Sequence, residues 1–229
     1  MNQALPKKTS LQIFLIDCHE ICLGGTIEVL HSQYPNATVL TAQTAENALQ
    51  QLSISQPDLV VIDIYIPEKP GVMASTNAGI QLLRNLMENY PNLNIIVHSA
   101  HIKSVVRIIP EIDAHTGGFT VADKTLSTKE MLARVDWALQ GLTHTKEIKE
   151  IYAELELKPE WHNLLTLAFQ EGLQDKAIAQ RISVSERMVR HYWDKLQNAL
   201  GIDGEELKNQ GKNLRIITQI RAREAGLID

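Results

Sequence analysis

The sequence has little cysteine and no long apolar run, and both absences restrict what the protein can be. Its two cysteines, Cys18 and Cys22, are too few and too close for a disulfide framework. His19 lies beside them, but no second ligand pair follows at zinc-finger spacing, so we expect reduced, partly buried thiols rather than metal ligands. No apolar stretch approaches the ~18 residues that a membrane-spanning helix needs. Residues 1–10 also lack the apolar core of a secretion signal, so we expect a cytoplasmic protein that does not enter a membrane.

A positive net charge is also missing. The formal net charge is -5, which argues against indiscriminate binding to polyanions. The segment from Lys176 to Lys195 departs from this balance, because its basic residues outnumber its acidic ones. The basic residues are Lys176, Arg181, Arg187, Arg190 and Lys195, and the acidic ones are Glu186 and Asp194. A local basic stripe of this kind can bind phosphate groups although the whole chain is acidic.

Residues 11–140 alternate short apolar runs with segments of helical periodicity. The run Leu59–Ile62 is continuous, as is typical of a strand buried on both faces of a parallel sheet. Five such strand–helix units predict an α/β fold with a doubly wound, five-stranded parallel sheet. The strands are expected at 11–16, 38–42, 59–62, 94–97 and 118–121, and the helices at 21–31, 45–52, 80–89, 103–109 and 128–139.

Polar residues follow four of these predicted strands. They are Asp17, Asp63, Ser99 and Lys124. Ligands of doubly wound sheets bind beyond the carboxyl ends of the strands, where these residues fall. A carboxylate can attack a phosphoryl group when a cation and hydrogen-bond donors neutralise the oxygens. Each residue alone could be a polar strand end, but four at successive ends favour a phosphoryl site.

The run Pro57–Pro67 resembles the phosphoacceptor segment of bacterial response-regulator receiver domains, which share the flavodoxin-like fold. The resemblance covers about residues 11–140. It implies that Asp63 is the phosphoacceptor, and that Asp17 and Asp63 bind Mg²⁺. It also implies that Ser99 and Lys124 contact the phosphoryl group, that the aromatic residue Phe119 moves with Ser99, and that a sensor histidine kinase is the partner.

The sequence departs from the receiver pattern at three places. Cys18 stands where the family has a second acidic residue, and a thiol is a poor ligand for a hard cation, so Mg²⁺ binding is in question. The loop at residues 68–78 is longer than is usual in the family and lies beside the expected site. Lys124 lies two positions further from Gly118 than the family spacing. A receiver that acts without phosphate, through dimerisation or partner docking, is therefore the alternative hypothesis.

The last third of the chain predicts helices separated by short turns. Residues 141–156 read as a part-helical linker, with Ile148, Ile151, Tyr152 and Leu155 at helical spacing. Residues 157–229 predict three helices in succession. The first runs from Pro159 to about Gln170, the second is capped by Asp175, and the third is capped by Ser185. Two helices joined by the turn 183–185 are typical of a helix-turn-helix, and a last helix is expected at 213–225.

The segments Glu171–Ala179, Ile182–Ser185 and Met188–Arg190 resemble the LuxR-type output domain. The resemblance implies binding to double-stranded DNA by a homodimer, in which the last helix helps to pair two output domains. The implied DNA-binding residues are Ser185, Arg187, Arg190, His191, Asp194 and Lys195. Of these, Arg190, His191 and Asp194 match base-contacting positions, whereas Arg187 and Lys195 approach the backbone.

The hypothesis that follows is a DNA-binding transcriptional response regulator that is not an enzyme. An aspartate-nucleophile phosphatase is the competing class, because such enzymes also place an aspartate after a parallel strand. They typically need a second carboxylate two positions on, and that position here is Tyr65. The sequence therefore favours regulation over catalysis.

Overall fold

In the computed structural model, the apolar runs of the first two-thirds of the chain form one parallel sheet in the order β2-β1-β3-β4-β5-β6. The prediction of a parallel α/β sheet is confirmed, but the predicted number of five strands is wrong. A short sixth strand pairs Thr143 with Phe119 and His144 with Thr120, and two residues are too few for a periodic sequence signal. The strands are β1 Gln12–Ile16, β2 Thr38–Ala42, β3 Leu59–Ile62, β4 Asn94–Ser99, β5 Phe119–Asp123 and β6 Thr143–His144.

The structure describes residues 10–146, 148–150 and 159–229, and the chain divides into two units. One comprises the chain up to Ile102 together with Pro110–Thr145, and the other comprises Lys103–Ile109 and Lys146–Asp229. Residues 1–9 of the predicted tail, and residues 147 and 151–156 of the predicted linker, lie outside the described residues. Within the described part of the chain, no helix is long and apolar enough to cross a membrane.

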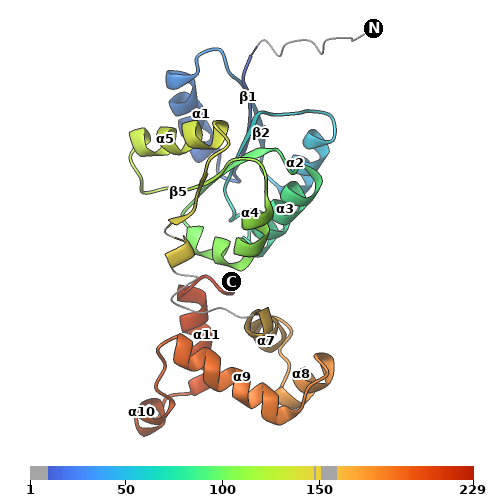
Figure 1. Cartoon of the computed structure of the whole chain (residues 1–229), viewed down its shortest axis with the longest axis vertical. Helices are drawn as coiled ribbons and strands as arrows, with labels where there is room; N and C mark the ends of the chain where they lie inside the picture. The colour runs from blue at the N-terminus through green and yellow to red at the C-terminus, as the bar shows by residue number, and fades with distance from the viewer. Residues whose placement is uncertain (1–9, 147, 151–158) are drawn as a thin grey trace. The chain divides into compact units, whose positions relative to one another are not determined.

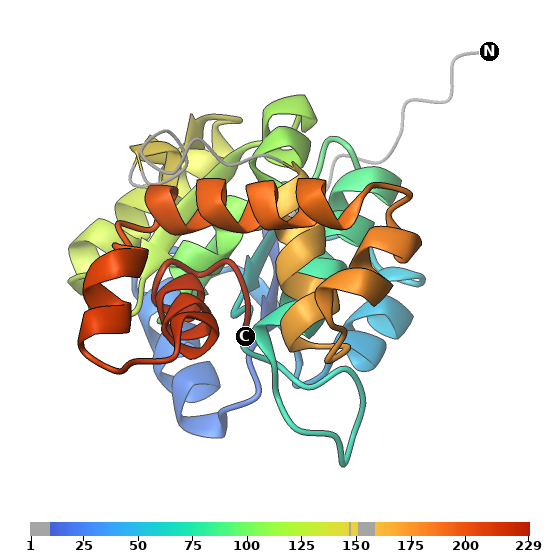
Figure 2. The same cartoon turned by 90° about the horizontal axis from the view of Figure 1, so that it is seen from below.

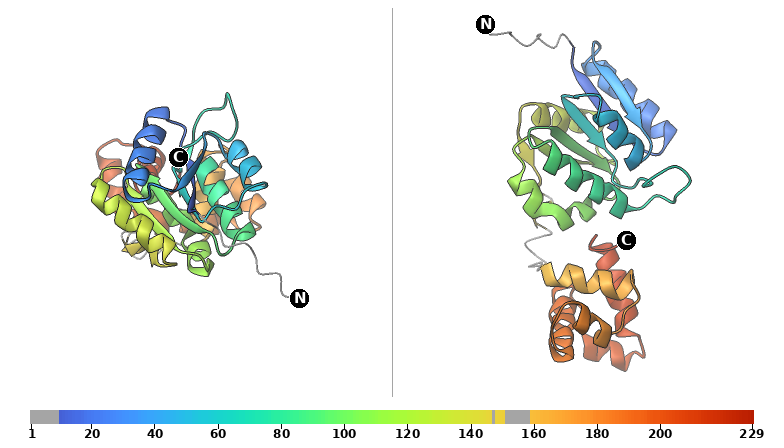
Figure 3. Two further views of the ribbon diagram at one scale, coloured as in Figure 1. Left: turned by 90° about the horizontal axis from the view of Figure 1, so that it is seen from above. Right: turned by 90° about the vertical axis from the view of Figure 1, so that its right-hand side faces the viewer.

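Helices cover both faces of the sheet (Figures 1 and 3). The helices α1 and α5 lie on one face, and α2, α3 and α4 lie on the other. Their bounds are α1 Glu20–Gln33, α2 Ala45–Leu52, α3 Thr76–Asn89, α4 Ile109–Ala114 and α5 Thr128–Leu139. A 3-10 helix, η1 Ile102–Ile108, replaces most of the helix predicted at 103–109. Side chains fix the helix starts: Thr44 accepts from the Asn47 amide at the start of α2, and Ser127 forms a capping box at the start of α5.

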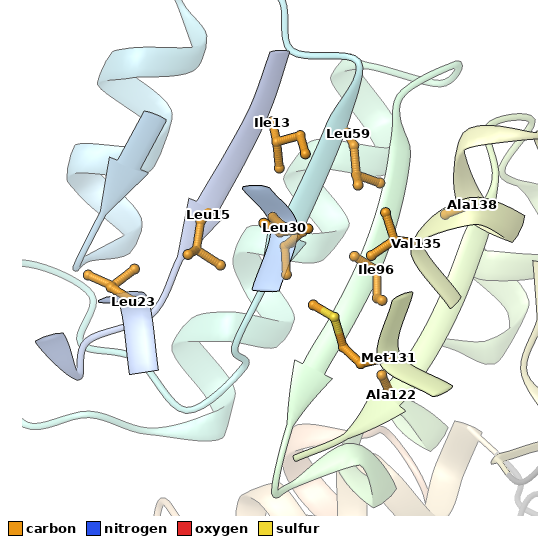
Figure 4. Close-up of a cluster of buried hydrophobic side chains, with 11 residues drawn as sticks. Ile13, Leu15, Leu23, Leu30, Leu59, Ile96, Ala122, Met131, Val135 and Ala138 are labelled. Atoms are coloured by element: carbon orange, nitrogen blue, oxygen red, sulfur yellow. The ribbon is translucent and has the colours of Figure 1, made fainter. Parts of the chain in front are cut away.

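Alternating strand residues form the apolar layer between the sheet and the helices α1 and α5 (Figure 4). Ile13 and Leu15 of β1, Leu59 of β3 and Ile96 of β4 point into this layer and are buried. From the helices, Leu23, Leu30, Met131, Val135 and Ala138 close it. Because both faces of the sheet are covered, the strands read as continuous apolar runs, and the polar residues collect at their carboxyl ends.

The second unit contains the remaining helices: α7 Pro159–Phe169, α8 Asp175–Arg181, α9 Glu186–Ala199, α10 Gly204–Asn209 and α11 Leu214–Glu224. In Figure 2, α9 is the long orange helix, and it packs against α7 and α8. Gly201 ends α9 with a φ of 66°, a left-handed conformation that glycine adopts without steric cost. The short helix α10 was not predicted, because its charged sequence Gly-Glu-Glu-Leu-Lys-Asn carries no apolar periodicity.

Candidate functional site

The carboxyl ends of β1 and β3 form the crevice of the first unit. The strand order reverses at this point, since β2 lies on one side of β1 and β3 on the other. Side chains at such a switch point have no helix directly above them and can receive a ligand. Asp17 follows β1 and Asp63 follows β3, whereas Ser99 ends β4 and Lys124 follows β5. The structure therefore brings these four predicted residues to one place.

Both oxygens of the Asp63 carboxylate accept hydrogen bonds. The Ser99 hydroxyl donates to Oδ1 over 2.6 Å, and the Tyr65 amide donates to the same oxygen over 2.9 Å. Lys124 Nζ donates to Oδ2 over 2.5 Å. Asp63 is 4% exposed, so these contacts replace water around its charge.

Lys124 is the internal counter-ion of the crevice. Its ammonium group also donates to Asp17 Oδ2 over 2.6 Å and thus connects the two carboxylates. Burial alone would lower the pKa of Lys124, but the hydrogen bonds and charges of Asp17 and Asp63 outweigh burial and raise this pKa above its ordinary value. The amine is therefore protonated at neutral pH, and it offsets part of the charge of the carboxylate pair.

Cys18 occupies the position beside Asp17 where the receiver pattern has an acid. Its thiol donates to the Tyr65 carbonyl over 3.4 Å. Burial raises the pKa of the Cys18 thiol, and the charges of Asp17 and Asp63 raise it further, so this group is neutral at pH 7. Magnesium requires near-octahedral oxygen coordination, and a neutral thiol replaces one oxygen ligand here. These residues do not fit a magnesium ion well.

Phe119, the predicted aromatic partner of Ser99, lies elsewhere. It is fully buried at the beginning of β5, where it pairs with Ile95. Ser99 pairs with Asp123 at the other end of the same strand. At roughly 3.3 Å for each residue, the register separates Phe119 from Ser99 by about 13 Å along the strands. The structure does not bring Phe119 to the crevice.

The long loop at residues 68–78 is tied back to the segment that follows Asp63. Ser75 forms an antiparallel bridge with Ile66, and its hydroxyl accepts from the Ala78 amide to begin α3. A Cβ atom on Gly79 would lie 2.1 Å from the Ile64 carbonyl oxygen, so only glycine permits this close approach of α3. The predicted loop therefore contributes the first turn of α3, and α3 fixes the backbone beside Asp63.

The helices α8 and α9 and the turn between them form a helix-turn-helix. Ser183 has a φ of 56° in the turn, and the Ser185 hydroxyl accepts from the Met188 amide to begin α9. Val189, Trp193 and Leu196 are buried against the unit. The predicted DNA-binding set, Ser185, Arg187, Arg190, His191, Asp194 and Lys195, is exposed. The spacing of these residues thus separates one apolar face of α9 from one charged face.

A polar cluster that sequence reasoning missed holds α9 in place. The sequence predicts Asp175 as the cap of α8, but Gln174 is the N-cap and Asp175 is the first helical residue. The Asp175 carboxylate instead accepts from Trp193 Nε1 over 3.0 Å and from Arg215 over 2.7 Å. The Arg215 guanidinium also lies 3.8 Å from the centre of the Trp193 ring. These residues lie far apart in the sequence, so no local pattern could indicate the cluster.

The first unit matches the family of response regulator receiver domains over residues 13–136. A curated relative, the DNA-binding transcriptional activator DevR/DosR of Mycobacterium tuberculosis, is 24% identical over 84% of this chain and 89% of its own length. The transcriptional regulatory protein YdfI of Bacillus subtilis is 22% identical over 83% of this chain and 89% of its own length.

Solved structures share the fold over most of the chain. The response regulator RcsB in complex with DNA matches with a TM-score of 0.58 and 17% identity, over 86% of this chain and 94% of that one. RcsB from Salmonella enterica serovar Typhimurium, bound to promoter rprA in the presence of phosphomimetic BeF3-, also matches with a TM-score of 0.58. Its identity is 19%, over 85% of this chain and 94% of that one.

Proposed function

Since this chain belongs to the family of response regulator receiver domains, we propose that it is a DNA-binding transcription regulator in which a receiver-like unit controls a helix-turn-helix output unit. The receiver-like unit would comprise about residues 11–140, and the output unit residues 157–229. The relatives DevR/DosR and YdfI, described as transcription regulators, support this proposal because each aligns along more than four-fifths of both chains. LuxR-type output domains are the class that the helix-turn-helix resembles.

The exposed charged face of α9 is the observation that carries the proposal. Val189, Trp193 and Leu196 anchor the helix through its buried face, so the charged residues on the opposite face are exposed. Arginine pairs with guanine and aspartate accepts from cytosine in the major groove, whereas cationic side chains also bind phosphate. We assign base contacts to Arg190, His191 and Asp194. Phosphate contacts are assigned to Arg187 and Lys195, with Ser185 at the helix start, where backbone amides favour an anion.

A second copy of the chain is the expected partner on DNA. Ile216 and Ile220 lie one turn apart on α11 and are 54% and 45% exposed, so they form an apolar stripe that solvent does not favour. One solved structure of RcsB is described as two dimers bound to two parallel DNAs, and it shares this fold with a TM-score of 0.56. We therefore propose a homodimer on DNA.

Two modes of control are proposed for the receiver-like unit. In the first, a sensor histidine kinase or a small phosphodonor supplies a phosphoryl group, and an oxygen of Asp63 attacks its phosphorus while the donor bond breaks. Ser99 and Lys124 would then hold the phosphoryl oxygens. In the second mode, the unit pairs with another copy or docks a partner without phosphate. The thiol of Cys18 favours the second mode, because it removes an oxygen ligand for the Mg²⁺ that usually assists phosphoryl transfer.

The DNA proposal is tested by selecting duplexes from a random pool with the full chain and measuring affinity against salt concentration. Arg187→Ala is expected to weaken binding to every duplex by a similar factor, and to reduce the salt slope by about one. Lys129→Ala is the matched control, because it removes the same charge from an exposed position on α5. Equal effects of both variants, or no selection of a sequence, would contradict the assignment of α9.

The mode of control is tested by intact-protein mass spectrometry after incubation with acetyl phosphate, with and without Mg²⁺. A gain of one phosphoryl mass that is absent from Asp63→Asn would establish the first mode. No gain, together with DNA affinity that the phosphodonor leaves unchanged, would establish the second. A gain that persists in Asp63→Asn would remove Asp63 as the acceptor.

A further inference from the structure

The turn between β1 and α1 brings together three side chains that commonly bind metals. They are Asp17, His19 and Cys22, and their ligand atoms all lie within 4.8 Å of one another. Among the described residues, this is the group in which imidazole, thiol and carboxylate converge. Two of the three, His19 and Cys22, play no part in the phosphoryl chemistry described above.

Local structure does not account for His19. It is the N-cap of α1, a position that usually takes Ser, Thr, Asp or Asn, yet its side chain caps no amide of the helix. Instead, Asp17 Oδ1 accepts from the His19 amide over 2.8 Å and lies 3.2 Å from ring atom Nδ1. Cys22 follows His19 by three positions and lies in the first helical turn of α1. It is therefore on the side of the helix that faces the connection between β1 and α1.

We propose that Asp17, His19 and Cys22 form a binding site for a borderline divalent metal ion such as Zn²⁺. Thiolate, imidazole and carboxylate are the ligands that zinc takes, whereas magnesium prefers oxygen. Tetrahedral coordination places ligand atoms roughly 3.5 Å apart, and the three ligand atoms here already lie within 4.8 Å of one another. Three protein ligands leave a fourth position for water, whereas structural zinc sites have four protein ligands.

The metal site and the contact to Lys124 use different oxygens of Asp17. Oδ2 accepts from Lys124 Nζ over 2.6 Å, whereas Oδ1 faces His19. An ion on Oδ1 therefore leaves the ammonium group in place. The side chain of His19 is 58% exposed, which gives the ion a path from solvent. Cys18 is not a member of the converging group; its thiol donates to the Tyr65 carbonyl over 3.4 Å and also lies 3.4 Å from His19 Nδ1.

The test uses the reduced full chain with Co²⁺ as a spectroscopic probe and Zn²⁺ in competition with a chromophoric chelator. One equivalent of Co²⁺ is expected to give a thiolate-to-cobalt absorption band that Zn²⁺ abolishes. Cys22→Ser should remove this band, and His19→Gln should weaken Zn²⁺ binding at least about tenfold, since even outer-shell substitutions reduce metal affinity by this factor. Circular dichroism and the unfolding temperature verify that each variant folds.

Two variants serve as matched controls. Cys18→Ser removes the neighbouring thiol, and His31→Gln removes an exposed imidazole from the last turn of the same helix. Both should keep the cobalt band and bind Zn²⁺ as the wild type does. The proposal is overturned if the wild type gives no thiolate band, or if Cys18→Ser loses the band as Cys22→Ser does. The inference goes beyond the proposed function, because DNA binding or its absence changes none of these readouts.

Discussion

The crevice of the sheet and the outer face of α9 differ in how their charges are satisfied. In the crevice, Lys124 pairs with both Asp17 and Asp63, so the charged groups bind one another. On α9, no described residue forms a hydrogen bond or ion pair with the side chains of Arg187 or Arg190. The charged groups of the crevice are therefore neutralised within the chain by ion pairs, whereas the charged side chains on the α9 face are available to an external partner.

Leu196→Ala is expected to change the free energy of unfolding most. Leu196 is 0% exposed and anchors the buried face of α9, so truncation should lower the free energy of unfolding of the output unit by about 2–5 kcal/mol. Its neighbour Lys195 is exposed, and Lys195→Ala should change stability by no more than about 0.5 kcal/mol. Urea unfolding followed by tryptophan fluorescence measures both. Equal stability losses would mean that α9 does not have one structural and one exposed face.

Lys124→Met breaks the charge network of the crevice. Removal of the ammonium group leaves Asp17 and Asp63 without their counter-ion, so we expect a loss of about 2–4 kcal/mol in the free energy of unfolding. Adding Asp63→Asn should recover part of that loss, because one of the two negative charges disappears. Lys129→Met, on an exposed turn of α5, is the control. A double variant as unstable as the single one would show that the network contributes little.

Ser183→Gly is expected to change the free energy of unfolding least. It should raise this free energy, whereas Leu196→Ala and Lys124→Met lower it. Ser183 holds a φ of 56° in the turn before α9, a conformation that costs a non-glycine residue free energy. Glycine loses more entropy on folding, so the net gain in stability should be about 0.5–1 kcal/mol. Ser185→Gly, at a φ of -78°, relieves no strain and removes the cap of α9, so it should not stabilise. Thermal unfolding distinguishes the two variants.

The sequence predicts the crevice better than its surroundings. Asp17 and Asp63 could be found because each follows an apolar run, and the carboxyl ends of parallel strands meet at one edge. The bonds that Tyr65 makes use its backbone amide and carbonyl, which leave no signature in the residue type. The resemblance to receiver domains implies that Phe119 is the aromatic partner of Ser99, and only the strand register shows how far Phe119 lies from Ser99.

In the output unit, too, the sequence predicts some features of the site and not others. Helical spacing separates Val189 and Leu196 from the charged face of α9, but spacing alone does not decide whether Tyr192 or its neighbour Trp193 lies at the centre of the apolar face. The structure buries Trp193, because Asp175 and Arg215 contact it from distant segments. Likewise, zinc-finger spacing does not indicate that Asp17 lies near Cys22, since the approach of these two residues depends on how α1 begins.

The most direct measurement of the central claim is the base preference of Arg190→Ala. The affinities of the wild type and the variant are compared for the selected duplex and for every single-base-pair change in it. The account predicts that the variant binds the selected duplex about 1–3 kcal/mol more weakly and loses its preference at one base pair, while the preferences elsewhere remain. An unchanged affinity and an unchanged preference profile would contradict the assignment of α9 as the helix that reads DNA.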